Sequence, residues 1–538
     1  MIVVAGAGTV GLSAALFLAH HGAEVLVVER REGPDVHPRA TGVGARTMEF
    51  FREVGIEDAV NAAAIPMTRG LGKVDAPTLA AADLHAPDLQ TAESEVAESE
   101  VAERKAAERK AAERKAAERE TLADAAPPRA LRMAERFGAF SPAALRGTCP
   151  QNRLDEVLLR AALDRGVKVA YSTTLTSFTQ DASGVTTVLT SDDAGPDGSV
   201  EQRADYLIAA DGARSGIREA LGIGTSGPGA LGEPLMNILF EADLTPYTRG
   251  NSFVACGTDA GLLVTIDGRR TWVLHVPRED GMSDERCREL VRAAVGDPGL
   301  DVRVVGAQPW RVRGQLADRF RDGRVFLVGD AAHTVPPLGA FGMNTGVADA
   351  HNLAWKLAAV LDGAAGPGLL DSYEAERRPV AALALEQSLI RLTDPRLHWG
   401  TGPEAVAARE AAGAVNAPIV VLGYRYDSSA IIGARAELPS TEDVVLDGSP
   451  GSRVPHQWVE DGVSTLDLVR SRFTVFTNAE LWAKAAKNAD LPCHLIEAGW
   501  LPENGMVLVR PDGFVAFRSS DASSTDLREV MRRLLAAN

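Results

Sequence analysis

The opening of the chain limits the possible folds more than any other part, because it joins two short apolar runs through a glycine-rich turn. The run "IVVA" predicts a buried strand, and "GAGTVG" directly after it places Gly6, Gly8 and Gly11 in GxGxxG spacing. A helix is expected to about His21, followed by a second strand that ends at Glu29. The pattern therefore predicts a βαβ unit at the start of an α/β fold.

This unit suits the binding of a dinucleotide. The glycines allow a tight turn and a close approach of backbone to a pyrophosphate, and the helix N-terminus offers free N–H groups and a positive dipole. Glu29 lies 18 residues beyond Gly11, where a carboxylate accepts hydrogen bonds from ribose hydroxyls. A glycine turn that serves packing alone is the weaker interpretation, and the unit by itself suits both NAD and FAD.

Two later apolar runs end in an aspartate beside a glycine. "YLIAADG" ends in Asp211 and Gly212, and "RVFLVGD" ends in Gly329 and Asp330. Parallel strands meet at their carboxyl ends, so both pairs are expected at the same edge of the sheet as the glycine turn. A carboxylate there suits the hydroxyls of a ribityl chain, which carries no phosphate charge to repel it, and this favours FAD.

The segment "AAHTVPPLGAFGMNTG" (331–346) separates the last of these pairs from a predicted helix. Proline and glycine shape the backbone rather than supply chemistry, so the segment predicts a loop that wraps a bound group. The helix is expected to begin near Met343. Its N-terminal dipole and free N–H groups stabilise negative charge on such a group.

Composition excludes several classes of partner. The 538 residues carry 56 Lys plus Arg against 73 Asp plus Glu, a formal net charge of -17, so neither a nucleic acid nor an anionic membrane is expected as a partner. The four cysteines show no CxxC or metal-ligand spacing, which predicts no disulfide framework and no metal site and fits a reducing cytoplasm. No long uninterrupted apolar stretch occurs and the apolar start lacks a basic region, so a soluble cytoplasmic protein is expected.

Residues 92–120 repeat a five-residue pattern built on "AESEV" and "AERKA". A period of five keeps no face of a helix apolar, although Ala, Glu, Arg and Lys are strong helix formers. The repeat therefore predicts a solvated helical spacer, with a partner-binding helix as the less favoured alternative.

At its three glycine and aspartate motifs, the sequence resembles the single-component flavoprotein aromatic hydroxylases of the para-hydroxybenzoate hydroxylase type. That family carries GxGxxG, DG and GD motifs in this order, and its third motif continues as GDAAHxxPPxGGxGxN. The resemblance covers about residues 1–395, and Ala340 stands where the family usually has a second glycine. If that position requires a positive φ, alanine costs about 1 kcal/mol there.

The resemblance implies which residues bind FAD. Arg39 matches a family arginine near the FAD phosphates, and Gln151 matches a glutamine that contacts the cofactor, although a surface or capping role remains open for both. His333 is expected to be a packed histidine. The full set of implied cofactor-binding residues is Gly6, Gly8, Val10, Gly11, Glu29, Arg30, Arg39, Arg46, Gln151, Asp211, Gly212, Gly329, Asp330, Pro337, Gly339, Gly342, Met343 and Asn344.

The expected fold class is α/β, with three parts. Alternating patterns predict hairpins at 173–191 and 261–276, and the second hairpin is expected in a separate sheet. The amino-acid composition changes after about residue 400. The expected parts are a discontinuous Rossmann-like FAD-binding domain (1–70, 145–225 and 300–395), an inserted sheet-containing substrate-binding domain (71–144 and 226–299), and a thioredoxin-like domain (400–538).

The family's reaction, carried over by the resemblance, is reduction of FAD by NADPH or NADH, formation of a flavin C4a-hydroperoxide with O2, and transfer of one oxygen to an aromatic ring. The cofactor performs the difficult step, so no catalytic dyad is expected. No second glycine-rich fingerprint appears, as expected for a nicotinamide cofactor that docks transiently. A Baeyer–Villiger outcome and a homodimer remain open.

The C-terminal region resembles that of larger members, which include hydroxylases of bacterial aromatic polyketides. A polycyclic polyketide of antibiotic biosynthesis is therefore the first substrate class expected, ahead of indolocarbazole intermediates and simple phenols. The lone Cys493 predicts no redox role for this region. An NAD-linked dehydrogenase and a catalytically silent flavin-binding protein are the alternatives from other classes.

The substrate pocket is expected between the flavin loop and the sheet of residues 232–276. The helix "LALEQSLIRL" would bring Arg391 to its rim, where a guanidinium stabilises a substrate phenolate and acts in catalysis. A solvent-facing arginine at a helix end is the favoured alternative.

Overall fold

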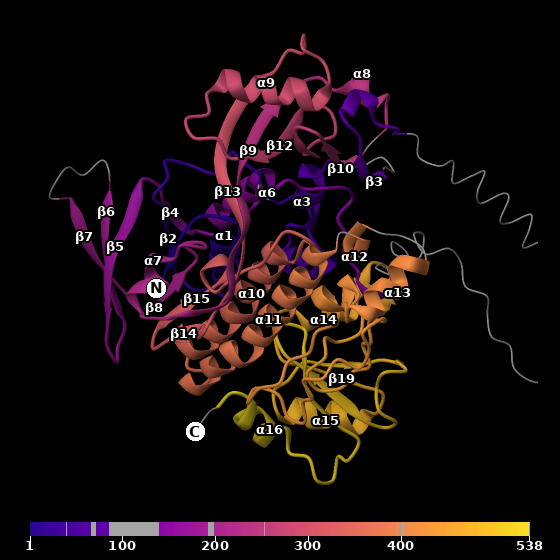
Figure 1. Cartoon of the computed structure of the whole chain (residues 1–538). Coiled ribbons are helices and arrows are strands. Elements are labelled where there is room, and N and C mark those ends of the chain that lie inside the picture. The colour runs from indigo at the N-terminus through magenta and orange to yellow at the C-terminus, as the bar shows by residue number, and fades with distance from the viewer. Residues whose placement is uncertain are drawn as a thin grey trace, which may run out of the picture. The chain divides into compact units, whose positions relative to one another are not determined.

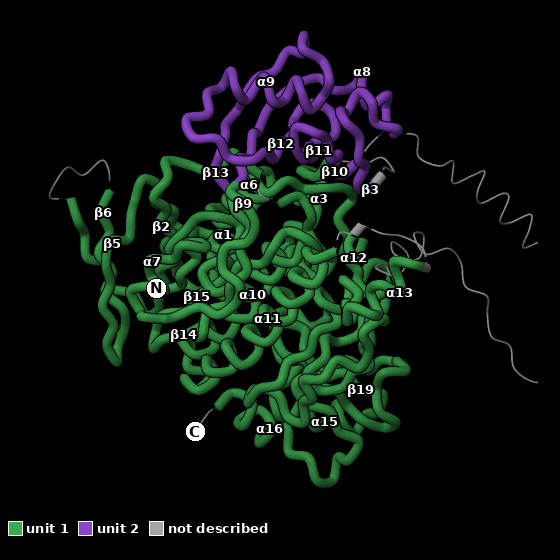
Figure 2. Tube along the Cα trace, viewed as in Figure 1, with its two compact units in different colours: residues 1–66, 138–234, 311–538 green, residues 67–137, 235–310 purple. Residues whose placement is uncertain are grey.

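The computed structural model describes residues 1–38, 40–65, 71–84, 139–191, 198–251, 253–394, 396–399 and 403–536 (Figure 1). Arg39 and the repeat of 92–120, for which the sequence makes predictions, lie outside these residues. The chain divides into two compact units (Figure 2). The first contains residues 1–66, 138–234 and 311–538, and the second contains residues 67–137 and 235–310.

A six-stranded sheet forms the centre of the first unit, in the order β14-β15-β8-β1-β2-β4. Five of the strands are parallel, and β14 alone is antiparallel to its neighbour. All four residues of β1 and of β8 are buried, as expected for strands covered on both faces. The strands are β1 (Ile2–Ala5), β2 (Val25–Val28), β4 (Lys168–Ala170), β8 (Tyr206–Ala209), β14 (Arg321–Asp322) and β15 (Val325–Leu327).

Helices enclose this sheet and share one large core with it. The core includes Leu12 and Phe17 of α1, Leu158 of α6, and Val347 and Leu353 of α10. The helical segments of the first unit up to residue 423 are α1 (Thr9–His20), α2 (Ala45–Glu53), α3 (Glu57–Ala63), α6 (Gln151–Asp164), α7 (Gly216–Ala220), η3 (Gly329–Ala331), α10 (Phe341–Leu361), η4 (Pro367–Leu370), α11 (Asp371–Thr393), α12 (Arg396–Trp399), α13 (Pro403–Ala411) and a π-helical turn, η5 (Ile419–Gly423). A three-stranded antiparallel sheet of β5 (Thr173–Gln180), β6 (Val185–Ser191) and β7 (Ser199–Ala204) completes it.

The second unit contains most of a seven-stranded sheet in the order β16-β13-β9-β12-β11-β10-β3, whereas β16 and the parts of β9 and β13 at 225–234 and 311–317 belong to the first unit. Phe240 and Trp272 on this sheet share a core with Cys287 and Val291 of α9 (Asp284–Val295), so α9 covers one sheet face. The unit also contains η1 (Leu79–Ala81) and α8 (Thr245–Thr248). The strands are β3 (Leu71–Asp75), β9 (Thr225–Glu241), β10 (Phe253–Thr258), β11 (Gly261–Thr265), β12 (Thr271–Pro277), β13 (Arg303–Ala317) and β16 (His333–Thr334).

The C-terminal region lies within the first unit and contains a four-stranded sheet in the order β20-β19-β21-β22. Val475 and Leu508 pack with Trp482 on one side of this sheet, and Phe476 and Val507 pack on the other. Its elements are β17 (Trp458–Glu460), β18 (Val463–Ser464), α14 (Thr465–Val469), β19 (Thr474–Thr477), α15 (Glu480–Asn488), β20 (Cys493–Leu495), β21 (Met506–Val509), β22 (Val515–Ser519) and α16 (Leu527–Leu534).

The helices and strands that short-range sequence patterns predict are confirmed. The opening βαβ unit, the hairpins β5–β6 and β11–β12, and the separate sheet for the second hairpin all form. The C-terminal region follows the order strand, helix, strand, hairpin and helix from β19 to α16. Among the described helices, none combines the length and apolar character that crossing a bilayer requires.

Ala340 adopts the left-handed conformation, with φ 55° and ψ 34°, directly before α10. The sequence predicted a cost at this position if φ were positive, and the structure fulfils that condition. We expect Ala340→Gly to raise the free energy of unfolding by about 0.5–1 kcal/mol, because glycine enters this region without Cβ strain but loses more chain entropy on folding. Urea unfolding of the apoprotein measures the change.

The matched control for Ala340→Gly is Ala348→Gly, inside the same helix and 5% exposed. Glycine in a helix interior costs about 1 kcal/mol, so this variant is expected to shift in the opposite direction. Equal destabilisation by both substitutions would contradict the strain at Ala340.

Candidate active site

The glycine turn between β1 and α1 has no room for side chains at two of its three glycines. A Cβ on Gly6 would lie 2.3 Å from the Ala210 carbonyl oxygen, and a Cβ on Gly11 would lie 1.9 Å from the Gly6 carbonyl oxygen. A Cβ on Gly8, in contrast, would meet no heavy atom within 4 Å. The turn therefore leaves open space beside Gly8, where the motif lets a pyrophosphate approach the backbone.

Glu29 ends β2 beside this turn and is 6% exposed. Its Oε2 accepts a hydrogen bond from the Ala7 N–H at 2.9 Å, and its Oε1 accepts one from Arg31 Nε at 3.0 Å. Burial by itself raises the pKa of Glu29, but these hydrogen bonds and the charge of Arg31 lower it below its ordinary value. The carboxylate is thus ionised and fixed at the turn, able to accept a ribose hydroxyl.

Arg31 was missed by the sequence analysis, which selected its neighbour Arg30. Arg30 is exposed, whereas Arg31 pairs with Glu29 and, through Nη1, with Asp35 at 2.7 Å. The alternating direction of side chains at the end of an extended strand was the available signal, because it brings residue 31 to the same side as residue 29.

The three strand ends that carry the motifs are aligned. Ala5 pairs with Ala209, and Ala209 pairs with Leu327, so the turns after β1, β8 and β15 emerge side by side. Asp211 follows β8, and its Oδ2 accepts a hydrogen bond from the Ile217 N–H at 3.2 Å. Its Oδ1 is buried and has no partner among the described residues. An unpaired buried carboxylate oxygen at this edge of the sheet fits a ligand with hydroxyl groups, as FAD has.

The GD pair after β15 combines a glycine in the left-handed conformation with an exposed acid. Gly329 has φ 57°, and a Cβ there would lie 2.9 Å from Val10 Cγ2. Gly346 of α10 packs against the same two residues. Asp330 is exposed, and Gly212 of the DG pair has φ 86°. Val10 therefore acts as a spacer between the first and third motifs.

Asn344 lies in the first turn of α10, and both polar atoms of its side-chain amide form hydrogen bonds within the protein. Its Nδ2 donates to the carbonyl oxygens of Gly42 at 3.1 Å and Ala340 at 2.9 Å, and its Oδ1 accepts from the Gly44 N–H at 2.8 Å and Thr47 Oγ1 at 2.7 Å. These bonds tie the 42–47 segment to the start of α10. The side chain thus contributes to a cofactor site by shaping the backbone around it.

The remaining loop residues lie near this helix start. Met343 is half-buried against the large core, Gly342 is half-buried, and Pro337 is exposed. Gly339 has φ 102°, with the Phe341 ring beside it. Ser388 of α11 fixes the loop by donating to the carbonyl oxygens at 336 and 338, at 2.7 and 2.9 Å. Gln151 is half-buried at the start of α6, and its backbone N–H donates to the carbonyl oxygen of Ala40 at 2.8 Å.

Asp349 in α10 is a fully buried acid that the sequence analysis missed. Its Oδ2 accepts from the Gly329 N–H at 3.1 Å and lies 2.7 Å from His333 Nε2, and its Oδ1 accepts from Arg377 Nε at 2.8 Å. Burial by itself raises the pKa of Asp349, but the charges and hydrogen bonds of His333 and Arg377 lower it. His333 is 2% exposed, which confirms a packed histidine.

Arg46 is 5% exposed and faces the C-terminal region. Its Nη1 donates to Glu49 Oε2 and its Nη2 donates to the Asp512 carbonyl oxygen, each at 2.7 Å. The guanidinium also lies over the Phe50 and Phe514 rings. These contacts give Arg46 a structural role, in place of the cofactor contact predicted from the sequence.

Arg391 is 3% exposed, which contradicts a solvent-facing position at the end of α11. Its Nη1 donates to the Gln387 carbonyl oxygen at 2.7 Å, its Nη2 donates to the Val415 carbonyl oxygen, and it lies over the Phe341 ring at 5.4 Å. Burial lowers its pKa from the ordinary arginine value. In the structure the guanidinium therefore holds the segment at 415 against α10 and α11.

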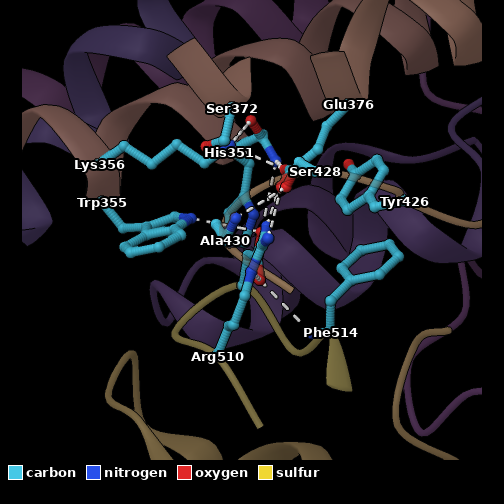
Figure 3. A network of polar contacts seen from close by, with 12 residues as sticks. His351, Trp355, Lys356, Ser372, Glu376, Tyr426, Ser428, Ala430, Arg510 and Phe514 are labelled. Atoms are coloured by element: carbon cyan, nitrogen blue, oxygen red, sulfur yellow. Dashed lines mark hydrogen bonds and ion pairs between the residues drawn. The ribbon is translucent and has the colours of Figure 1, made fainter. Parts of the chain in front are cut away.

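A network of buried ion pairs joins the C-terminal hairpin to α10 and α11 (Figure 3). Glu376 accepts hydrogen bonds from Arg510 and from Lys356 Nζ at 2.8 Å, and all three side chains are fully buried. Asp512 pairs with Arg510 and accepts from Trp355 Nε1 at 3.3 Å. Burial lowers the pKa of Lys356 to about 8, so the amine remains largely protonated beside Glu376 at pH 7.

The four cysteines are free thiols, and burial raises the pKa of each above the ordinary value. For Cys149, Cys256 and Cys493 the pKa is about 11. Because the thiolate is the reactive form, we expect folded protein at pH 8 to react slowly with thiol reagents and to release all four thiols only on unfolding in urea. A rapid reaction of one equivalent with folded protein, abolished by Cys493→Ser, would contradict this expectation.

Two family models match the chain. The first, described as an FAD-binding domain, matches residues 1–388, and the second, described as the aromatic-ring hydroxylase C-terminal region, matches residues 447–537. The chain belongs to the flavoprotein aromatic hydroxylases. It is therefore an FAD-dependent monooxygenase.

Relatives are similar over nearly the whole chain. The tetracenomycin A2 monooxygenase-dioxygenase of Streptomyces glaucescens is 36% identical, over 99% of this chain and 96% of the relative. A 4-methyl-5-nitrocatechol 5-monooxygenase of a Burkholderia species is 35% identical, over 99% and 97%. The solved structure of an aklavinone-11 hydroxylase with FAD and aklavinone is 31% identical, covers 99% and 98%, and has a TM-score of 0.79.

Proposed function

We propose that this hydroxylase acts on a polycyclic aromatic polyketide, consuming O2 and NADPH or NADH. The observation that carries the proposal is the full-length similarity to the tetracenomycin A2 enzyme, together with the similarity to a hydroxylase solved with aklavinone. Both compounds named in these relatives are the kind of polyketide that the sequence analysis placed first.

We propose the sheet face opposite α9 as the floor of the substrate pocket. Ile238 and Leu274 point toward α9 and belong to its core, so their neighbours Asn237 and His275 occupy the other face. Asn237 Oδ1 lies 2.5 Å from His275 Nδ1, and the Trp310 ring lies 5.7 Å from the His275 ring. An aromatic surface with one hydrogen-bonded polar pair suits a flat, oxygenated ring system.

We propose that the cofactor-binding set named in the sequence analysis, apart from Arg46, binds FAD, with Glu29 on the ribose and Asp211 and Asp330 on the hydroxyl-rich part of the molecule. The proposal for Glu29 and Asp211 is supported by the aligned strand ends and by the unpaired Asp211 oxygen. Arg39, which lies outside the described residues, keeps its proposed place near the phosphates. The three-part domain division, a cytoplasmic location and a homodimer also remain proposals.

A substrate screen tests the proposed substrate class. We expect purified, FAD-loaded protein to oxidise NADPH or NADH faster in the presence of a polycyclic aromatic polyketide, and to yield a product one oxygen atom heavier by mass spectrometry. Comparison of initial rates with NADPH and NADH identifies the reductant.

Simple nitrocatechols are the second candidate substrates, because the Burkholderia relative is almost as similar over the whole chain. Product formation from a nitrocatechol and none from polycyclic compounds would reverse the proposal. NAD(P)H oxidation that releases only hydrogen peroxide with every aromatic compound would indicate a flavoprotein without hydroxylase turnover.

A further inference from the structure

We propose that the C-terminal hairpin positions the flavin-binding turn at Gly329 through a continuous chain of buried side chains, in which Tyr426 is the positioning residue. The proposal rests on the proposed assignment of Gly329 and Asp330 to FAD. It gives the C-terminal region a role in cofactor binding, although the region has no reactive thiol pair.

The chain of contacts starts in the turn between β21 and β22. The Arg510–Glu376 ion pair and the bond from Trp355 to Asp512 fix this turn against α10 and α11 (Figure 3). Phe514 leaves the turn and stacks on Tyr426, with 4.0 Å between ring centroids and 25° between ring planes. Both rings are at most 2% exposed, so the position of one limits the position of the other.

Tyr426 connects the hairpin to α11, so the restricted position of its ring also restricts a side chain of that helix. Its hydroxyl oxygen accepts a hydrogen bond from Arg377 Nη1 at 3.0 Å. The other two nitrogens of the Arg377 guanidinium also donate hydrogen bonds, Nε to Asp349 at 2.8 Å and Nη2 to the Thr345 carbonyl oxygen at 3.1 Å. The guanidinium is fully buried, so each of its donors needs an acceptor from the protein.

Asp349 connects Arg377 to the turn after β15. One carboxylate oxygen pairs with Arg377, and the other accepts from the Gly329 N–H at 3.1 Å and contacts His333. A carboxylate held on both sides has one orientation, and that orientation fixes the Gly329 amide. Loss of the Tyr426 hydroxyl leaves Arg377 Nη1 without an acceptor, which shifts the guanidinium and with it the carboxylate.

The adjacent Tyr424 provides a matched control. Its ring also stacks on Phe514, at 5.7 Å, but its hydroxyl is buried and has no partner among the described residues. Tyr426→Phe and Tyr424→Phe therefore remove the same atom from neighbouring buried rings, and only the first removes a hydrogen bond to Arg377. Phe514→Leu changes the same series of contacts at its hairpin end.

The test compares FAD affinity with apoprotein stability in the full-length chain. The dissociation constant is measured by quenching of FAD fluorescence at a temperature where each apoprotein is folded, and the melting temperature of each apoprotein is measured separately. We expect Tyr426→Phe and Phe514→Leu to raise the FAD dissociation constant by about 5-fold, in the usual range for coupling through packed side chains. Tyr424→Phe is expected to bind FAD as the wild type does.

A purely structural role would lower the melting temperature of the Tyr426→Phe apoprotein and leave the FAD dissociation constant unchanged, and that result would overturn the proposal. An equal loss of FAD affinity in Tyr424→Phe would overturn it as well. Failure of the proposed substrate class would give a different result from failure of this inference. In that case the wild-type protein would bind FAD but would hydroxylate no polycyclic compound.

Discussion

Glu376→Ala is expected to lower the free energy of unfolding by about 3–5 kcal/mol, because it leaves two buried cations without their shared acid. Glu376 is 1% exposed and accepts hydrogen bonds from Lys356, Arg510, Asn352 and Ser428. After the substitution Arg510 retains Asp512, but Lys356 loses its ion pair. Urea unfolding of the apoprotein, followed by tryptophan fluorescence, measures the change, and Trp355 lies beside the network as a reporter.

The control for this prediction is Glu386→Ala on the same helix. Glu386 is exposed, so its replacement is expected to change the free energy of unfolding by less than about 0.5 kcal/mol. A loss below about 1 kcal/mol for Glu376→Ala would show that the three charges do not stabilise each other as their geometry suggests.

Gly8→Ala is expected to weaken FAD binding by about 10- to 100-fold, equivalent to about 1.4–2.8 kcal/mol, and to leave the apoprotein as stable as the wild type. Gly8 has φ -81°, which alanine adopts without strain, and its added Cβ would meet no protein atom within 4 Å. The methyl group would, however, project into the space that the motif keeps for a pyrophosphate. FAD titration and apoprotein unfolding, measured on the same preparation, separate the two effects.

Gly11→Ala is the contrasting variant for this prediction. Its Cβ would lie 1.9 Å from the Gly6 carbonyl oxygen, so we expect the apoprotein itself to be destabilised, with yield and FAD content both reduced. Unchanged FAD affinity in Gly8→Ala would place the pyrophosphate away from Gly8 and would require a new assignment of the glycine turn.

The predictions that succeeded depend on short-range pattern. The glycine spacing predicted the turn between β1 and α1, because a side chain at Gly6 would collide with the backbone after β8 and a side chain at Gly11 would collide with Gly6. The β21–β22 hairpin likewise turns at a Pro-Asp-Gly sequence, which is typical of such turns, and Gly513 there has φ 79°. The aspartates after β8 and β15 were placed correctly because the strand register brings their turns to one edge of the sheet.

The predictions that failed concern charged side chains with distant partners. A hairpin turn is usually exposed, yet Arg510 is fully buried with a partner 134 residues away in sequence. Arg391 was predicted at the rim of the substrate pocket, and Arg46 was predicted to contact FAD. Both are buried, and the sequence around an arginine on a helix gives no local sign of burial. Asp349 carried no motif, and its role appears only when α10, α11 and the turn at Gly329 are brought together.

The buried network between the hairpin and the paired helices has a consequence for engineering chimeric hydroxylases. A natural crossover point would be the composition change near residue 400, but a cut there separates Glu376 from Arg510 and Arg377 from Tyr426. A foreign C-terminal region without Arg510 would remove one cation from the buried Glu376, and a region without Tyr426 would leave a buried Arg377 donor without its acceptor. The transferable module therefore begins before α10 and carries both helices with the hairpin, so recombination boundaries should be chosen by charge partnership rather than by sequence composition.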